Sequence, residues 1–185
     1  MTTKINPLII AFGCYLALHF LQLFVIFPLE TKYGSDLTFA ASLFFLPHLV
    51  RVLAVWMLGP SAFFALLPAD IIIHLIIRQL TDIQILIPLV GSGCAVIAFE
   101  LFKLAGMNFY LTATNTSNWR PLLLIGAVAS VINSVGSSLL YQGLILPEDA
   151  LPLLGNYLIG DILGLFFGLL ILTGLVRLLR LNAAR

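Results

Sequence analysis

The ionisable side chains that lie inside apolar stretches are the residues of this chain whose types and spacing could do chemistry. Arg51 lies eight residues before Gly59, and Asp70 lies ten residues after Pro60. If two antiparallel helices meet at Gly59-Pro60, both side chains sit at a matching depth, about 12 and 15 Å from the turn. A charge inside a membrane helix costs about 2.5–3.5 kcal/mol on insertion scales. We therefore expect an Arg51–Asp70 ion pair that either fixes the hairpin or lines a polar pocket, unless Arg51 extends to the cytoplasmic headgroups.

A third ionisable residue, Asp161, lies in the run I-G-D-I-L-G-L-F-F-G-L, residues 159–169. Gly160, Gly164 and Gly168 recur every four residues there, so they form one stripe along a helix. Asp161 lies about 60° from the middle of this stripe and faces the same neighbour. Small residues let helices approach closely in lipid. The stripe is therefore predicted to be a helix-packing face, either within this chain or against another protein.

Asp161 needs a polar partner at its depth, and three residues could provide one. Asn133 lies midway along a span rich in small residues, and His48 and Arg51 lie near the middle of another. Together these residues predict a polar cluster that could bind a ligand or protons. Its members are Asp161, Arg51, Asp70, His48 and Asn133.

The three histidines, His19, His48 and His74, fall in three different apolar runs. Two intramembrane histidines on separate helices could ligate a haem iron. His74 follows Asp70 by four residues, so the carboxylate could instead orient the imidazole. No second motif supports haem or a metal site, and no P-loop, HExxH or GxSxG motif is present. We expect hydrogen-bonded interior histidines, no cofactor and no enzymatic activity.

The composition of the chain indicates which type of secondary structure positions these residues. Of 185 residues, 61% are apolar and 9% are charged, whereas soluble domains carry about 25% charged residues. The net charge is +1, and no basic cluster suits a nucleic acid. We expect one all-α domain in a lipid bilayer. Its spans are predicted at approximately 8–28, 37–59, 60–80, 84–104, 119–143 and 152–178.

The distribution of basic residues predicts the orientation of the six spans. With an even number of spans, both termini and the second and fourth loops lie on one side. That side carries Lys4, Lys103, Arg120, Arg177, Arg180 and Arg185, whereas the other carries Lys32 and Arg78. The positive-inside rule then places both termini in the cytoplasm.

Two stretches resemble the MASE1 domain, a bacterial integral-membrane sensory module. The first is F-F-L-P-H-L-V-R-V-L-A-V-W-M-L-G-P-S-A-F-F-A-L-L-P-A-D, residues 44–70, and the second is N-Y-L-I-G-D-I-L-G-L-F-F-G-L-L, residues 156–170. Leu170 stands where the family pattern has a proline, and Arg51 lies outside the pattern. MASE1 domains usually precede an output domain, and no stretch here is long and polar enough to form one.

The resemblance implies a stand-alone, non-enzymatic protein of the bacterial inner membrane that acts by binding. It would sense a small ligand, or serve as an accessory or scaffolding subunit that docks on another membrane protein in trans. A small transporter, or the substrate-binding membrane subunit of one, is the alternative. Three intramembrane prolines and the buried Arg51, Asp70 and Asp161 permit this second function. A haem-binding membrane subunit is the third hypothesis.

Overall fold

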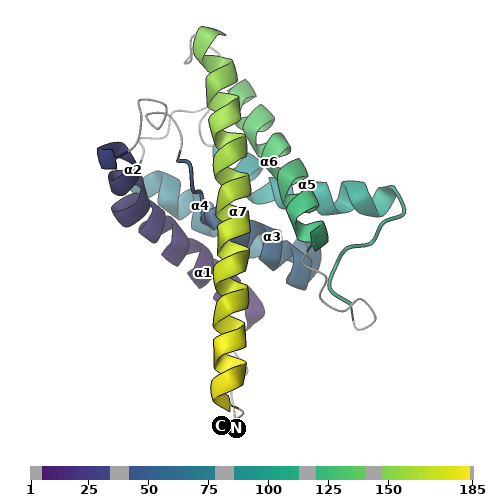
Figure 1. The fold of residues 1–185 in the computed structure, drawn as a ribbon. Helices are drawn as coiled ribbons and strands as arrows, with labels where there is room; N and C mark the ends of the chain where they lie inside the picture. The colour runs from purple at the N-terminus through teal and green to yellow at the C-terminus, as the bar shows by residue number, and fades with distance from the viewer. Residues whose placement is uncertain (1–5, 34–41, 78–85, 113–119, 141–146, 184–185) are drawn as a thin grey trace.

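The computed structural model describes residues 6–33, 42–77, 86–112, 120–140 and 147–183, and its regular structure there is helical (Figure 1). The predicted all-α class is therefore confirmed. The elements in chain order are α1 (Pro7–Leu21), a π-helical turn η1 (Gln22–Ile26), α2 (Phe27–Tyr33), α3 (Pro47–Leu58), a 3₁₀ turn η3 (Gly59–Ala62), α4 (Phe63–Ile77), α5 (Ile87–Leu104), α6 (Arg120–Leu140) and α7 (Pro147–Ala183).

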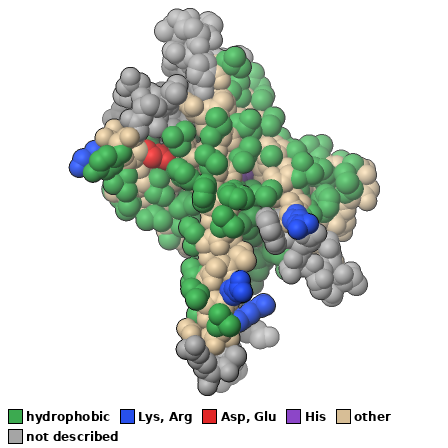
Figure 2. Space-filling model, in the orientation of Figure 1, with side chains coloured by type: hydrophobic (Ala, Val, Ile, Leu, Met, Phe, Trp, Pro, Cys, Tyr) green, Lys and Arg blue, Asp and Glu red, His purple; other side chains and the backbone are tan. Residues whose placement is uncertain are grey.

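Five helical segments in the described residues are long and apolar enough to cross a membrane. They are Pro7–Tyr33, Pro47–Ile76, Ile87–Leu104, Arg120–Leu140 and Leu154–Asn182. Hydrophobic side chains cover most of the face seen in Figure 2, as expected for a chain surrounded by lipid. These features suggest a multi-pass membrane protein.

The segment Pro47–Ile76 is a hairpin and not one straight helix. Arg51 and Asp70 are 19 residues apart, which is about 28 Å along a continuous helix. Their side chains nevertheless approach to 3.7 Å. The chain reverses at η3, where Gly59 ends α3 with a positive φ of 67°. A left-handed conformation of this kind favours glycine, because a β-carbon would clash there.

The helix expected at 37–59 is shorter in the structure. Residues 42–46 are not helical, and α3 begins only at Pro47, whose missing N–H suits the first helical position. The amide of Phe45 donates to the carbonyl of Gly160 at 3.0 Å, and the amide of Leu46 donates to Gln22 Oε1 at 3.3 Å. Because both amides have partners inside the protein, the backbone can leave the helical conformation beneath α7.

The remaining helices begin and end close to their predicted positions. α5 and α6 correspond to the spans expected at 84–104 and 119–143, and α7 exceeds the expected 152–178 at both ends. α6 packs against both α5 and α7, and α3 also packs against α7. In Figure 1, α7 runs across the other helices as one long rod. The core that forms between these helices contains the ionisable residues singled out above.

Candidate functional site

A cavity of about 170 Å³ lies between the helices of the bundle. At about 30 Å³ per molecule of liquid water, its volume corresponds to roughly five or six waters. Its polar lining comes from α1, α3, α4, α6 and α7. Those lining residues are His19, Arg51, Asp70, His74, Asn133, Ser137 and Tyr157. The rest of the lining is apolar and includes Leu23, Phe45, Ile73 and Ile87, so the cavity suits a small molecule with a polar and an apolar part.

Arg51 forms the centre of the cavity wall. Its Nε donates a hydrogen bond of 2.7 Å to the hydroxyl of Tyr15, and its Nη2 lies 3.7 Å from Oδ2 of Asp70. The guanidinium carbon also lies 5.5 Å from the ring centre of Tyr15 and 5.3 Å from that of Phe45. Both rings attract the cation through their π-electrons. Arg51 is thus held inside the protein and does not extend to the headgroups.

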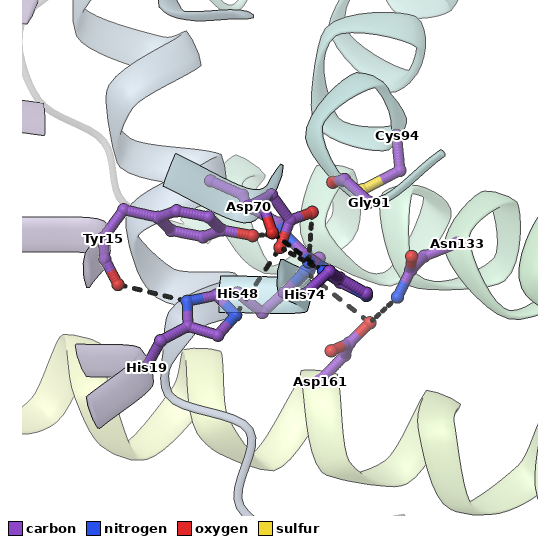
Figure 3. A network of polar contacts seen from close by, with 10 residues as sticks. Tyr15, His19, His48, Asp70, His74, Gly91, Cys94, Asn133 and Asp161 are labelled. Atoms are coloured by element: carbon purple, nitrogen blue, oxygen red, sulfur yellow. Dashed lines mark hydrogen bonds and ion pairs between the residues drawn. The ribbon is translucent and has the colours of Figure 1, made fainter. Parts of the chain in front are cut away.

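Two histidines flank the carboxylate of Asp70 (Figure 3). Nε2 of His19 lies 3.7 Å from Oδ1, and Nδ1 of His74 lies 3.8 Å from the same oxygen. Each ring is fixed by a backbone carbonyl four residues earlier: His19 Nδ1 bonds Tyr15 O at 3.1 Å and His74 Nδ1 bonds Asp70 O at 2.8 Å. His74 is thus oriented by the main-chain carbonyl of Asp70, and the carboxylate of Asp70 remains available to the cavity.

Asp161 lies in a second polar group that adjoins the cavity. Its Oδ2 accepts hydrogen bonds from Ser130 Oγ at 3.0 Å and from Asn133 Nδ2 at 3.2 Å. His48 Nδ1 lies 3.6 Å from the same oxygen, and His48 Nε2 lies 3.1 Å from the carbonyl oxygen of Gly126. The structure therefore brings Asp161 together with His48 and Asn133, whereas Arg51 pairs with Asp70. Asn133 connects the two groups, since it also lines the cavity.

The glycine stripe of α7 packs on this chain's own segment 42–49. A β-carbon on Gly160 would strike the carbonyl oxygen of Ser42, and one on Gly164 would strike that of Phe45. A β-carbon on Gly168 would lie 2.7 Å from Cδ2 of Leu49. The glycines thus allow the non-helical segment to lie directly against α7, which directs Arg51 and His48 into the core.

The π-helical turn η1 contacts the non-helical segment 42–46 through the side chain of Gln22. It begins at Gln22, whose Nε2 donates to Ser42 Oγ at 2.6 Å. Turns of this type expose backbone groups and are frequent at functional sites. One buried amide side chain therefore ties η1 to the non-helical segment 42–46, which leads into α3, the helix that carries Arg51.

Sequence reasoning missed three residues of the site: Tyr15, Gln22 and Ser130. Tyr15 is completely buried and precedes His19 by four residues, so their shared helix face was a usable signal. Gly91 is a further residue that the sequence does not single out. In the structure, a β-carbon there would lie 2.7 Å from Asp70 Oδ2 and 2.8 Å from Arg51 Nη2.

Several buried polar atoms in the site have no hydrogen-bond partner in the described part of the chain. They are Arg51 Nη1, both carboxylate oxygens of Asp70, Asp161 Oδ1, His48 Nδ1 and Ser92 Oγ, although the hydroxyls of Tyr15 and Ser92 lie near enough to act on the Asp70 carboxylate without a hydrogen bond of good geometry. Leaving a buried polar group unpaired costs about 1–3 kcal/mol, and a charged one costs more. An occupant that supplies both donors and acceptors would remove part of this cost.

Two of the three histidines direct Nε2 at another group of the protein. His48 uses Nε2 on Gly126, and His19 directs Nε2 at Asp70. Among the residues that the structure describes, no three histidine, cysteine, aspartate or glutamate side chains lie close enough together to hold a metal ion. The haem hypothesis therefore gains no support from the geometry.

Comparison with protein-family models, with curated proteins and with solved structures finds no match for this chain.

Proposed function

We propose that this chain is a MASE1-like sensor of the bacterial inner membrane that binds a small polar ligand in the cavity at Arg51 and Asp70. The observation that supports it is the set of unpaired atoms on these two residues. Arg51 Nη1 offers a donor and the Asp70 oxygens offer acceptors, all buried beside about 170 Å³ of space. The role is non-enzymatic, and the signal passes to another membrane protein in trans.

Ligand binding is better supported than a purely scaffolding role. A scaffold that docks through the glycine stripe needs that face to be open, but Ser42, Phe45 and Leu49 of the same chain cover it. A scaffold also needs no cavity, and its buried polar groups would be fully paired. The unpaired atoms at Arg51 and Asp70 favour the sensor over the scaffold.

The proposed topology has six spans with both termini in the cytoplasm. It treats α3 and α4 as separate arms of a hairpin, in line with the chain reversal at η3. The start of α1 and the end of α7 point toward the same end of the molecule in Figure 1. Lys103, Arg120, Arg177 and Arg180 lie at helix ends that this topology assigns to the cytoplasm, in agreement with the positive-inside rule.

The second candidate function is transport of the same ligand. One observation favours it: residues 42–46 are not helical although they pack against α7, and the 12-residue α3 begins only after them. Non-helical backbone within the protein, next to a helix end, lines substrate sites in secondary transporters. Accumulation of a bound compound in vesicles that contain the protein would assign transport, whereas binding without accumulation would assign sensing.

A pair of matched variants tests ligand binding. Ile87→Phe adds volume at the cavity wall, while Ile97→Phe makes the same change on the outer face of α5, where Ile97 is 48% exposed. We expect an amino acid, carboxylate or amine from a panel of small metabolites to raise the melting temperature of the wild type and of Ile97→Phe, but not of Ile87→Phe. If no compound separates the two variants, the cavity is not a binding site.

A further inference from the structure

The buried charges in the described part of the chain do not balance. The fully charged side chains buried there are Arg51, Asp70 and Asp161, with two negative charges against one positive charge. Arg51 lies 3.7 Å from Asp70 and compensates it. Asp161 has hydrogen bonds from Ser130 and Asn133, but these donors carry no charge. The charge of Arg51 also acts on Asp161, so one guanidinium serves two buried carboxylates, and the site has room for one more positive charge.

The tautomer of His48 indicates where an additional positive charge would bind. The carbonyl oxygen of Gly126 can only accept, so His48 Nε2, 3.1 Å away, must carry the hydrogen. In a neutral imidazole, Nδ1 then carries a lone pair and no hydrogen. This lone pair faces Oδ2 of Asp161 at 3.6 Å, which sets two acceptors against each other. A single proton on either atom turns the repulsion into attraction, because it creates an imidazolium–carboxylate pair or a neutral carboxyl group.

We propose that His48 and Asp161 form a proton-binding site that holds one proton and is coupled to the cavity through Asn133. Asn133 donates from Nδ2 to Asp161 and lines the cavity, so loss of the proton changes the hydrogen bonds of a cavity residue. Coupling of this kind is reciprocal: a ligand that fixes Asn133 in one orientation changes the affinity for the proton, and the proton changes the affinity for the ligand. Only the coupling rests on the proposed function.

Arg51 carries the one full positive charge among the buried side chains of the described residues, and it acts on two carboxylates. α3 contributes Arg51, which contacts Asp70 of α4 and Tyr15 of α1 and whose charge also acts on His48 and Asp161. α1 also contributes His19 and α4 contributes His74, both of which flank Asp70. α5 contributes the buried thiol of Cys94, which donates to the carbonyl of Gly91. α6 contributes only the uncharged Ser130 and Asn133.

A proton fits this place better than a metal cation. The distance of 3.6 Å between Nδ1 and Oδ2 exceeds a good N–H···O hydrogen bond by about 0.7 Å, so a small movement of the side chains would let a proton bridge the two atoms. A sodium ion needs several oxygen ligands, whereas Ser130 Oγ and Asn133 Nδ2 present hydrogen atoms to Asp161 and not lone pairs. The groups around Asp161 therefore favour a proton over a sodium ion.

The experiment reads the proton without any ligand, on the full-length protein in lipid nanodiscs. Nitrogen-15 labelling of histidine distinguishes an imidazolium from a neutral ring by nuclear magnetic resonance, and His48→Gln assigns the signal. Infrared spectroscopy with carbon-13-labelled aspartate detects a protonated carboxyl group, and Asp161→Asn assigns that band. We expect one proton per chain at neutral pH, either as a His48 imidazolium or as an Asp161 carboxyl group. Glu100→Gln, outside the cluster, should leave both spectra unchanged.

Each outcome decides the proposal. A neutral His48 with a bare Nδ1, in a protein that shows no protonated aspartate, overturns it, and the wild-type spectra suffice for this result if a variant fails to fold. A spectrum that changes when sodium replaces choline in the buffer assigns a metal cation and also overturns it. Because no ligand is added, failure here is separate from failure of the cavity test with Ile87→Phe.

Discussion

Gly91 of α5 lies directly against the carboxylate of Asp70 in α4, so closely that a β-carbon on Gly91 would sit 2.7 Å from Oδ2. The same β-carbon would sit 2.8 Å from Nη2 of Arg51. A methyl group there would push apart two charges that hold each other in place. We expect Gly91→Ala to lower the free energy of unfolding by about 1–3 kcal/mol, measured by thermal or denaturant unfolding in mild detergent.

The matched control for this change is Gly93→Ala in the same helix. A β-carbon on Gly93 meets nothing closer than the ring of Phe63 at 3.8 Å, an ordinary contact. Replacing a helical glycine by alanine without a clash gains about 0.5–1 kcal/mol. Equal stability of the two variants would contradict the close approach of Gly91 to the ion pair.

Arg51 and Asp70 should be strongly coupled in a double-mutant cycle. Arg51→Met leaves the buried Asp70 without its positive partner, which costs about 3–5 kcal/mol, and Asp70→Leu strands Arg51 in the same way. The combined variant carries neither charge, so we expect it to be more stable than either single variant. Denaturant unfolding of the four proteins gives the coupling energy. Additive losses would mean that the pair does not interact.

Gly164→Ala should disrupt the contact between α7 and the non-helical segment. The new β-carbon would strike the backbone carbonyl of Phe45, which cannot rotate away as a side chain can. We expect a lower melting temperature, with a loss of about 1–3 kcal/mol. Gly174→Ala in the same helix is the control, because nothing lies within 4 Å of a β-carbon there. A melting temperature equal to that of the wild type would show that residues 42–46 do not lie against α7 at Gly164.

Tyr110 should give the protein a pH-dependent stability in alkaline solution. It lies beyond the end of α5, stacks on Phe99 with ring centres 5.0 Å apart, and donates to Glu100 Oε1 at 2.7 Å. Burial first, and then the bond to Glu100, raise the pKa of Tyr110 above its ordinary value of about 10.

The sign follows from proton linkage. Above pH of about 10 the unfolded chain releases this proton while the folded chain keeps it, so the contribution of Tyr110 to stability is constant below that pH and falls as the pH rises further. Tyr110→Phe cannot ionise, and we expect its stability to fall less over the same range. Unfolding curves of both proteins at neutral and alkaline pH measure the difference. Parallel pH profiles would show that Tyr110 titrates normally.

The sequence alone was sufficient for the fold class and for much of the polar group. Apolar runs long enough to span a bilayer, with few charges, permit little besides helices, because backbone polar groups in lipid must bond within their own segment. The approach of Arg51 to Asp70 followed from their similar distance to the Gly59 turn. Asn133 and His48 were available as partners of Asp161 because few other polar residues lie at that depth.

Only the tertiary structure decided which faces meet. Helical periodicity places Gly160, Gly164 and Gly168 on one stripe, but it carries no information about the neighbour, which proves to be the non-helical segment 42–46 and the start of α3. The same limit applies to Tyr15 and Gln22, whose partners Arg51 and Ser42 are 36 and 20 residues away. The orientation of His48 depends on a carbonyl 78 residues distant. Contacts of that range arise when the whole chain packs, since local sequence constrains only the next helical turn.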